Sequence, residues 1–76
     1  LSNNPFMLKQ AGYFAERLQA EAGKAPAKQV RLGFALAFGR PPSEEEQRAA
    51  ETTIRNKGLF ALCHVLLNAN EFVYLD

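Results

Sequence analysis

Glycine and proline divide this chain into four segments, and that division limits the fold more than any other feature. Gly23, Gly39 and Gly58 each follow a stretch with helical periodicity, and glycine is the residue that most often closes a helix. Prolines stand where a helix can begin, because the fixed φ of proline suits the first helical turn and disrupts a later one. We therefore expect four helices, at about 5–22, 26–38, 44–57 and 59–67.

Several of these helices also have capping signals. Asn4 is a favoured N-cap before a proline, and Ser43 and Glu46 have the pattern of a capping box, in which each side chain accepts a hydrogen bond from the other residue's amide. Asn68 and the residues after it favour a turn. We therefore expect the last helix to end before Asn68, with a short C-terminal helical turn headed by Asn70.

The apolar residues follow helical spacing, and no segment alternates as a strand would. The first segment has one apolar stripe and the third is mostly polar. Residues 32–38 and 59–67 are apolar on nearly every side, which is typical of helices surrounded by protein. Gly33 costs about 1 kcal/mol relative to alanine inside a helix, so we expect a neighbouring helix to approach closely there. The predicted fold class is all-α, a compact bundle of four helices.

Composition limits the size and chemistry of the domain. The 76 residues are 47% apolar, with nine basic and eight acidic side chains, so 1–76 forms a single small helical domain. One cysteine and one histidine exclude a disulfide framework and a zinc site, and we expect no metal or cofactor. The longest apolar run, 32–39, is shorter than the roughly 18 residues of a transmembrane segment. No signal-peptide pattern is visible in these residues. Because Leu1 is not methionine, we expect the C-terminal fragment of a longer chain.

Cys63 and His64 are the residues that a nucleophilic enzyme would use as thiolate and base. Adjacent residues on a helix point about 100° apart, and leucines around Cys63 favour its neutral thiol. We therefore expect a buried structural cysteine. The stretch Phe60–His64 lacks the first cysteine of a c-type haem motif, so covalent haem is not expected. The glutamates after Ser43 are explained by the helix dipole, and no catalytic residue is predicted.

Lys24, Lys28, Arg31 and Arg40 form a basic segment (24–40) without an acidic residue. Such a segment can bind phosphate, anionic lipid or nucleic acid. A helix-turn-helix arrangement would, however, place the three glutamates of 44–46 against DNA, so nucleic acid is not the expected partner.

Arg40 has a tightly held backbone, because it follows a helix-ending glycine and precedes two prolines. We expect a structural role for its guanidinium, which can cap the carbonyls of the second helix or pair with a carboxylate. The candidate carboxylates belong to Glu45, Glu46 and Glu71.

Three blocks of the chain, Asn3–Phe6, Phe38–Glu46 and Leu66–Asp76, resemble a known family. The family pattern is Asn-x-Pro-Phe, Leu-Gly-Arg-x-Pro-x-x-Glu-Glu and Leu-Leu-Asn-x-Asn-Glu-Phe-x-Tyr-x-Asp, with Phe38 here in place of the leucine. The family that this chain resembles is a C-terminal domain of unknown function, found in large, exported, planctomycete-type proteins. Some of these proteins are joined to a cytochrome-c-like module. The resemblance implies an extracytoplasmic or cell-envelope location and no known reaction.

The expected function is a non-catalytic helical module for intramolecular packing or protein–protein interaction in a large exported protein. Its partners would be preceding domains of the same chain or another protein. Aromatic residues near the chain ends, which so small a domain cannot fully bury, form the expected contact surface: Phe6, Phe72 and Tyr74. The alternatives are anion or nucleic-acid binding through 24–40, and an enzyme site to which this chain contributes one wall.

Overall fold

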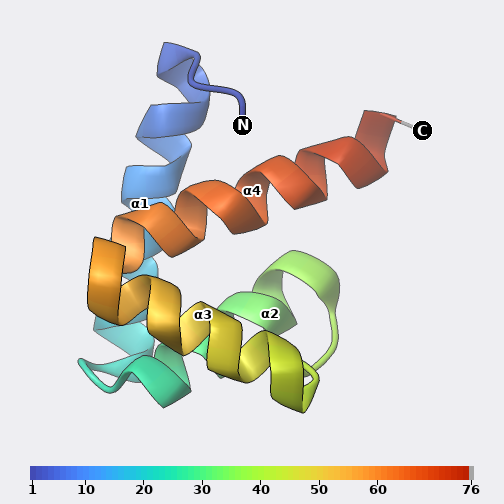
Figure 1. Ribbon diagram of the computed structural model, residues 1–76. Helices are drawn as coiled ribbons and strands as arrows, with labels where there is room; N and C mark the ends of the chain where they lie inside the picture. The colour runs from blue at the N-terminus through green and yellow to red at the C-terminus, as the bar shows by residue number, and fades with distance from the viewer. Residues whose placement is uncertain (76) are drawn as a thin grey trace.

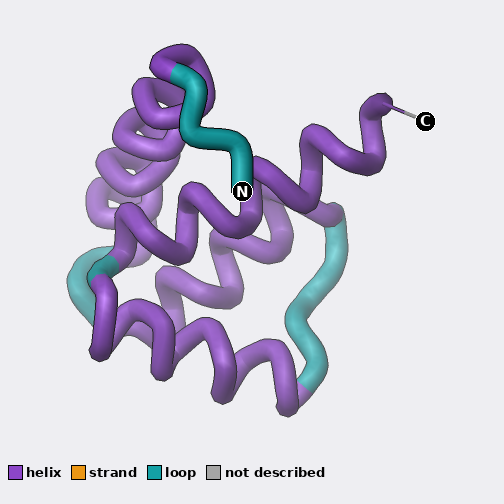
Figure 2. Tube along the Cα trace, turned by 45° about the horizontal axis from the view of Figure 1, so that its top comes forward, coloured by secondary structure: helices purple, strands orange, loops and turns teal. Residues whose placement is uncertain are grey.

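The computed structural model describes the backbone of residues 1–75 and the side chains of residues 1–70. Over these residues the chain forms helices and no strand (Figures 1 and 2). The helices are α1 (Pro5–Ala22), α2 (Pro26–Phe38), α3 (Glu44–Lys57) and α4 (Leu59–Leu75). The predicted all-α bundle is confirmed, and the first three helices have the predicted bounds.

The helix ends form as the sequence predicts. The Ser43 hydroxyl accepts from the Glu46 amide at 3.1 Å, and the Glu46 carboxylate accepts from the Ser43 amide at 2.8 Å, which completes the capping box. Gly39 closes α2 in the left-handed conformation, with φ 68°, and its amide donates to the Ala35 carbonyl at 2.9 Å. These local bonds direct the chain from α2 into α3.

The predicted end of the fourth helix is wrong, because α4 continues without a break to Leu75. The two asparagines that suggested a turn are satisfied inside the helix. Asn68 Nδ2 donates to the His64 carbonyl one turn earlier at 2.8 Å, and Asn70 Nδ2 donates to the Ala37 carbonyl of α2. Since both amides have partners that a helix permits, they do not interrupt it.

The central helices of the bundle are α2 and α4, each of which contacts the other three. Figure 1 shows α3 and α4 running in opposite directions, with α1 at a steep angle to both. The sequence predicted that both central helices are surrounded by protein. This prediction is wrong, because each of them has exposed apolar side chains. Leu36 of α2 is 39% exposed, and Phe60 and Val65 of α4 are 44% and 42% exposed. Four short helices are too few to cover both central ones completely.

The core lies where α1, α2 and α4 cross. Leu18, Val30 and Cys63 are fully buried there. At the crossing, a Cβ added to Gly33 would lie 3.1 Å from Leu66 Cδ1 and 3.4 Å from Leu18 Cδ1. The close approach predicted at Gly33 is therefore confirmed, and leucines from two helices occupy the space that a side chain would take.

Candidate functional site

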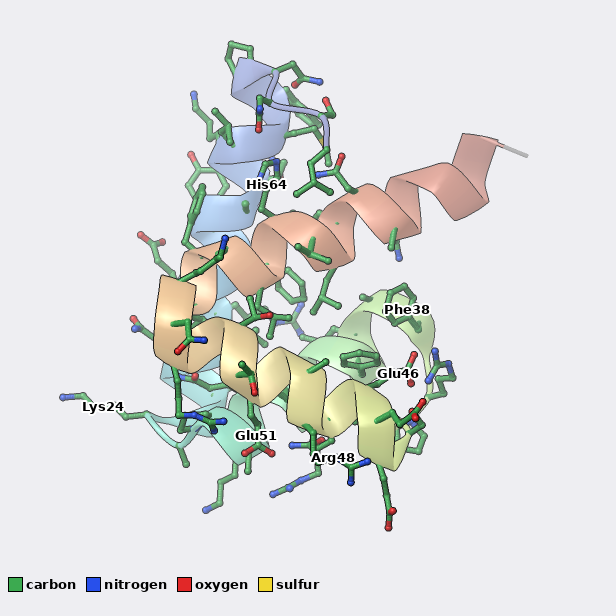
Figure 3. The ribbon with its side chains drawn as sticks, viewed as in Figure 1. Lys24, Phe38, Glu46, Arg48, Glu51 and His64 are labelled. Atoms are coloured by element: carbon green, nitrogen blue, oxygen red, sulfur yellow. The ribbon has the colours of Figure 1, made fainter. Side chains whose placement is uncertain are left out.

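Cys63 and His64 are not brought together as nucleophile and base. The Cys63 side chain lies in the core beside Ala11 and Leu18, and burial raises the pKa of its thiol to about 12. The His64 ring instead lies against the N-terminal segment, where its Nε2–H donates to the Ser2 carbonyl at 2.5 Å (Figure 3). The thiol is therefore protonated at neutral pH and enclosed by apolar groups, which makes it a poor nucleophile.

We expect iodoacetamide to alkylate Cys63 at pH 8 at least about 100-fold more slowly in the folded chain than in 8 M urea, because reaction requires opening of the core. Mass spectrometry of quenched samples measures both rates. Equal rates under the two conditions would contradict the buried position of this thiol.

Arg40 pairs with Glu46, one of the three carboxylates proposed from the sequence. Its Nη1 and Nη2 donate to the two carboxylate oxygens at 2.8 and 2.9 Å, a bidentate arrangement. The guanidinium carbon also lies 5.6 Å from the ring centroids of Phe34 and Phe38. The hydrogen bond from Arg40, together with the Ser43 amide, lowers the pKa of Glu46 to about 2. Arg40 thus joins the end of α2 to the start of α3.

The depressed pKa of Glu46 gives this pair a definite pH dependence. A carboxyl whose folded pKa is about 2, against an ordinary 4.5, stabilises the fold above pH 4.5. That contribution is lost progressively as the pH falls from 4.5 towards 2. We expect Glu46→Gln to lower the urea midpoint at pH 7, and the difference from wild type to shrink below pH 4.5.

Circular dichroism at 222 nm along a series of urea titrations from pH 2 to 7 measures this effect. Glu45→Gln is the matched control, since Glu45 is the neighbouring exposed carboxylate and makes no ion pair among the described side chains. A midpoint difference for Glu46→Gln that is as large at pH 2 as at pH 7 would contradict the ion-pair assignment.

The basic segment does not form a single site. Arg40 is bound to Glu46, and Figure 3 shows Lys24 apart from Arg48, in the connection between α1 and α2. Arg31 of α2 instead shares a shallow hollow of about 390 Å³ with Arg48 of α3. Sequence reasoning missed Arg48, because it lies outside 24–40 and only the packing of α3 on α2 brings it near Arg31. Glu44 and Gln47 line the same hollow.

Lys28 is exposed on α2, one turn before Arg31. It does not line the Arg31–Arg48 hollow. Of the four basic residues singled out from the sequence, Arg31 lies in a concave surface with a second cation, Arg48.

Two long-range hydrogen bonds join the N-terminal segment (Leu1–Asn4) to α4. The Ser2 amide donates to Asn68 Oδ1 at 2.7 Å, and the Ser2 carbonyl accepts from His64 Nε2 at 2.5 Å. Because His64 and Asn68 are four residues apart, they share one face of α4. We call this pair the backbone clamp. No sequence pattern predicts the clamp, since the residue that it holds, Ser2, lies more than 60 residues away.

Exposed apolar side chains belong to the N-terminal segment, to the start of α1 and to the residue beside the His64 ring. Leu1 is 76% exposed, and Phe6, in the first turn of α1, is 68% exposed. The Phe60 ring, 44% exposed, lies 6.3 Å from the His64 ring. We call Leu1, Phe6, Phe60 and the backbone clamp the N-terminal surface. It contains the predicted contact residue Phe6.

The other two predicted contact residues are Phe72 and Tyr74, whose side chains lie outside the described residues.

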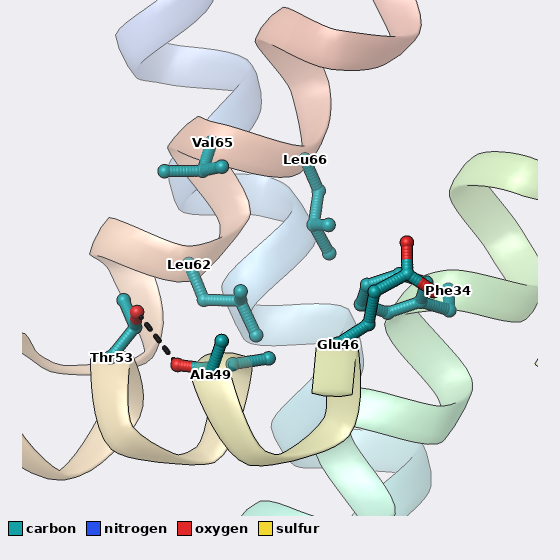
Figure 4. Close-up of a pocket in the computed structure, with 8 residues that line it drawn as sticks. Phe34, Glu46, Ala49, Thr53, Leu62, Val65 and Leu66 are labelled. Carbon is teal, nitrogen blue, oxygen red and sulfur yellow. Dashed lines mark hydrogen bonds between the residues drawn. The ribbon is translucent and has the colours of Figure 1, made fainter. Parts of the chain in front are cut away.

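A second apolar surface lies between α3 and α4. It is a hollow of about 190 Å³ lined by Phe34, Leu62, Leu66 and smaller neighbours (Figure 4). Thr53 does not leave its hydroxyl free there, because it donates to the Ala49 carbonyl at 3.1 Å. The hollow is smaller than the 300–1,000 Å³ typical of small-molecule sites.

Among the described residues, no three His, Cys, Asp or Glu side chains are grouped so that they can hold a metal ion. Within the same part of the chain, no helix has the length and apolar character needed to cross a membrane. Comparison of the chain with protein-family models, with curated proteins and with solved structures finds no match.

Proposed function

We propose that this chain is a non-catalytic helical module that binds protein through its N-terminal surface. The bound protein is either the rest of a longer chain or a separate partner. The observation that carries the proposal is the exposure of Phe6, which is 68% exposed in the first turn of α1, four residues after the Ser2 backbone that the clamp holds. Exposed aromatic anchors beside polar groups are characteristic of protein interfaces.

The positions and partners of the reactive side chains support a non-catalytic role. Cys63 is buried in the core, His64 binds a backbone carbonyl, and Glu46 is held by Arg40. These three groups thus each have a structural partner or a buried position. The proposal also places the protein outside the cytoplasm, at the cell envelope, on the resemblance to exported planctomycete-type proteins.

Site-specific photocrosslinking tests the interaction. Benzoylphenylalanine at position 6 of the natural protein, irradiated in its own cells, is expected to form one protein adduct that mass spectrometry maps to a defined segment. The matched control places the same group at Gln19, an exposed position near the other end of α1. Adduct formation at position 6 no greater than at position 19 would refute the proposal.

Anion binding is the second candidate function, and the hollow shared by Arg31 and Arg48 favours it. Neither arginine makes an ion pair with another described side chain. Binding of inorganic phosphate, followed by NMR at low salt and at 200 mM salt, tests this candidate, because electrostatic affinity falls as salt screens the charges. Arg48→Gln should abolish the effect; salt-independent shifts, or none, would exclude it.

A further inference from the structure

The backbone clamp holds both backbone hydrogen-bonding groups of one residue, Ser2, in the N-terminal segment. Ser2 donates its amide hydrogen to Asn68 and accepts from His64, at 2.7 and 2.5 Å. A neighbouring β-strand satisfies a residue's backbone in the same way. Here two side chains, one helical turn apart on α4, take the place of the strand.

The clamp is already oriented for this task. Asn68 Nδ2 donates to the His64 carbonyl at 2.8 Å, and this bond turns Oδ1 towards the Ser2 amide. A carbonyl oxygen can only accept a hydrogen bond, so the His64 ring carries its hydrogen on Nε2. His64 Nε2–H is therefore the donor of the clamp and Asn68 Oδ1 is its acceptor.

The clamp recognises the backbone of Ser2 and not its side chain. The Ser2 hydroxyl accepts from Asn4 Nδ2 at 2.9 Å, within the N-terminal segment itself. Any extended residue that keeps its amide hydrogen meets the same requirement. Recognition of main-chain groups, with specificity from neighbouring pockets, is a common way to bind peptides.

We propose that the backbone clamp is a binding site for an extended polypeptide segment of a partner protein, and that Leu1–Asn4 occupies it as an intramolecular competitor. This inference rests on the proposed function, since it names the class of partner for the N-terminal surface. Phe60, beside His64 and 44% exposed, supplies an apolar surface for a side chain of the bound segment.

Competition makes a quantitative prediction. A site that is filled by its own chain binds an external ligand more weakly, in proportion to the fraction of time that it is open. Two hydrogen bonds with modest net energies hold the N-terminal segment, so removal of residues 1–3 should strengthen peptide binding by roughly tenfold. The deletion keeps Asn4, the N-cap of α1.

The test is an NMR titration with the capped tetrapeptide acetyl-Leu-Ser-Asn-Asn-amide. In the shortened chain we expect saturable shifts of the Asn68 side-chain amide and the His64 ring, with a Kd on the order of 10 mM, a weak affinity set by two hydrogen bonds of modest net energy. A peptide with alanine in place of serine should bind equally well, because the serine side chain is not recognised. A peptide N-methylated at the serine should not bind, and Asn68→Ala should abolish binding.

No saturable shift, or equal binding of the N-methylated peptide, would overturn the inference. Far-UV circular dichroism first confirms that the shortened chain is folded; otherwise Ser2→Pro in the full chain, which removes the amide hydrogen, opens the clamp. The outcomes separate the two proposals. Loss of peptide binding with crosslinking at position 6 intact removes only the clamp site, whereas loss of crosslinking with peptide binding intact removes the proposed function.

Discussion

Leu18→Ala is expected to lower the free energy of unfolding by about 3–4 kcal/mol. Leu18 is fully buried and packs with Ala11 and Cys63, and its Cδ1 also lies at the crossing with Gly33. Truncation removes apolar contacts and leaves a cavity at the crossing of α1, α2 and α4, which the surrounding side chains cannot readily fill. A domain of this size has a total stability of only roughly 5–10 kcal/mol, so the variant should be close to unfolding at 37 °C.

Urea denaturation followed by circular dichroism measures the loss. Leu36→Ala is the matched control, since Leu36 is 39% exposed and its removal leaves no enclosed cavity. We expect it to cost less than about 1.5 kcal/mol. If the two variants were destabilised equally, Leu18 would not be at the centre of the core.

Gly33→Leu is expected to cost about 3 kcal/mol, because the added side chain has no space at the helix crossing. The first added carbon alone would lie 3.1 Å from Leu66 Cδ1, closer than ordinary van der Waals contact. A helix is more stable with leucine than with glycine by roughly 0.8 kcal/mol, so any loss of folding stability in this variant must come from packing and not from helix propensity.

Gly33→Ala separates the two effects. It adds only the carbon that touches the leucine tips, and the propensity gain of about 1 kcal/mol offsets the small shift that these tips must make. We therefore expect near-wild-type stability for this variant. Ala35→Leu, at an exposed position of the same helix, is the control for leucine in α2. A stable Gly33→Leu variant would show that the helices are not in close contact there.

The helices could be predicted from sequence because their ends are encoded locally. The Ser43–Glu46 capping box and the glycine at 39 act within a few residues, and both form as expected. The continuation of α4 could not be predicted in this way. Asn68 and Asn70 favour turns in isolation, but the first bonds within its own helix and the second bonds to α2. The local preference of these asparagines for a turn is therefore overridden by hydrogen bonds that form only when α4 is helical and packed on α2.

The candidate site was less accessible to sequence reasoning. The sequence left open whether Arg40 caps the carbonyls of the second helix or pairs with one of three carboxylates. Glu46 was among these carboxylates, because only a short connection separates it from Arg40. The backbone clamp and the Arg31–Arg48 hollow depend on which helix faces meet, and no local pattern specifies that. His64 was considered only as a neighbour of Cys63, although the residue that shares its helix face is Asn68.

The packing of α1 has a consequence for synthesis on the ribosome. The apolar face of α1 is covered mainly by α4, which is the last helix of this chain to be translated. Met7, Ala11 and Leu18 must therefore stay exposed to solvent, or to a chaperone, until α4 leaves the exit tunnel. A nascent chain arrested before residue 59 should accordingly be protease-sensitive over its full released length.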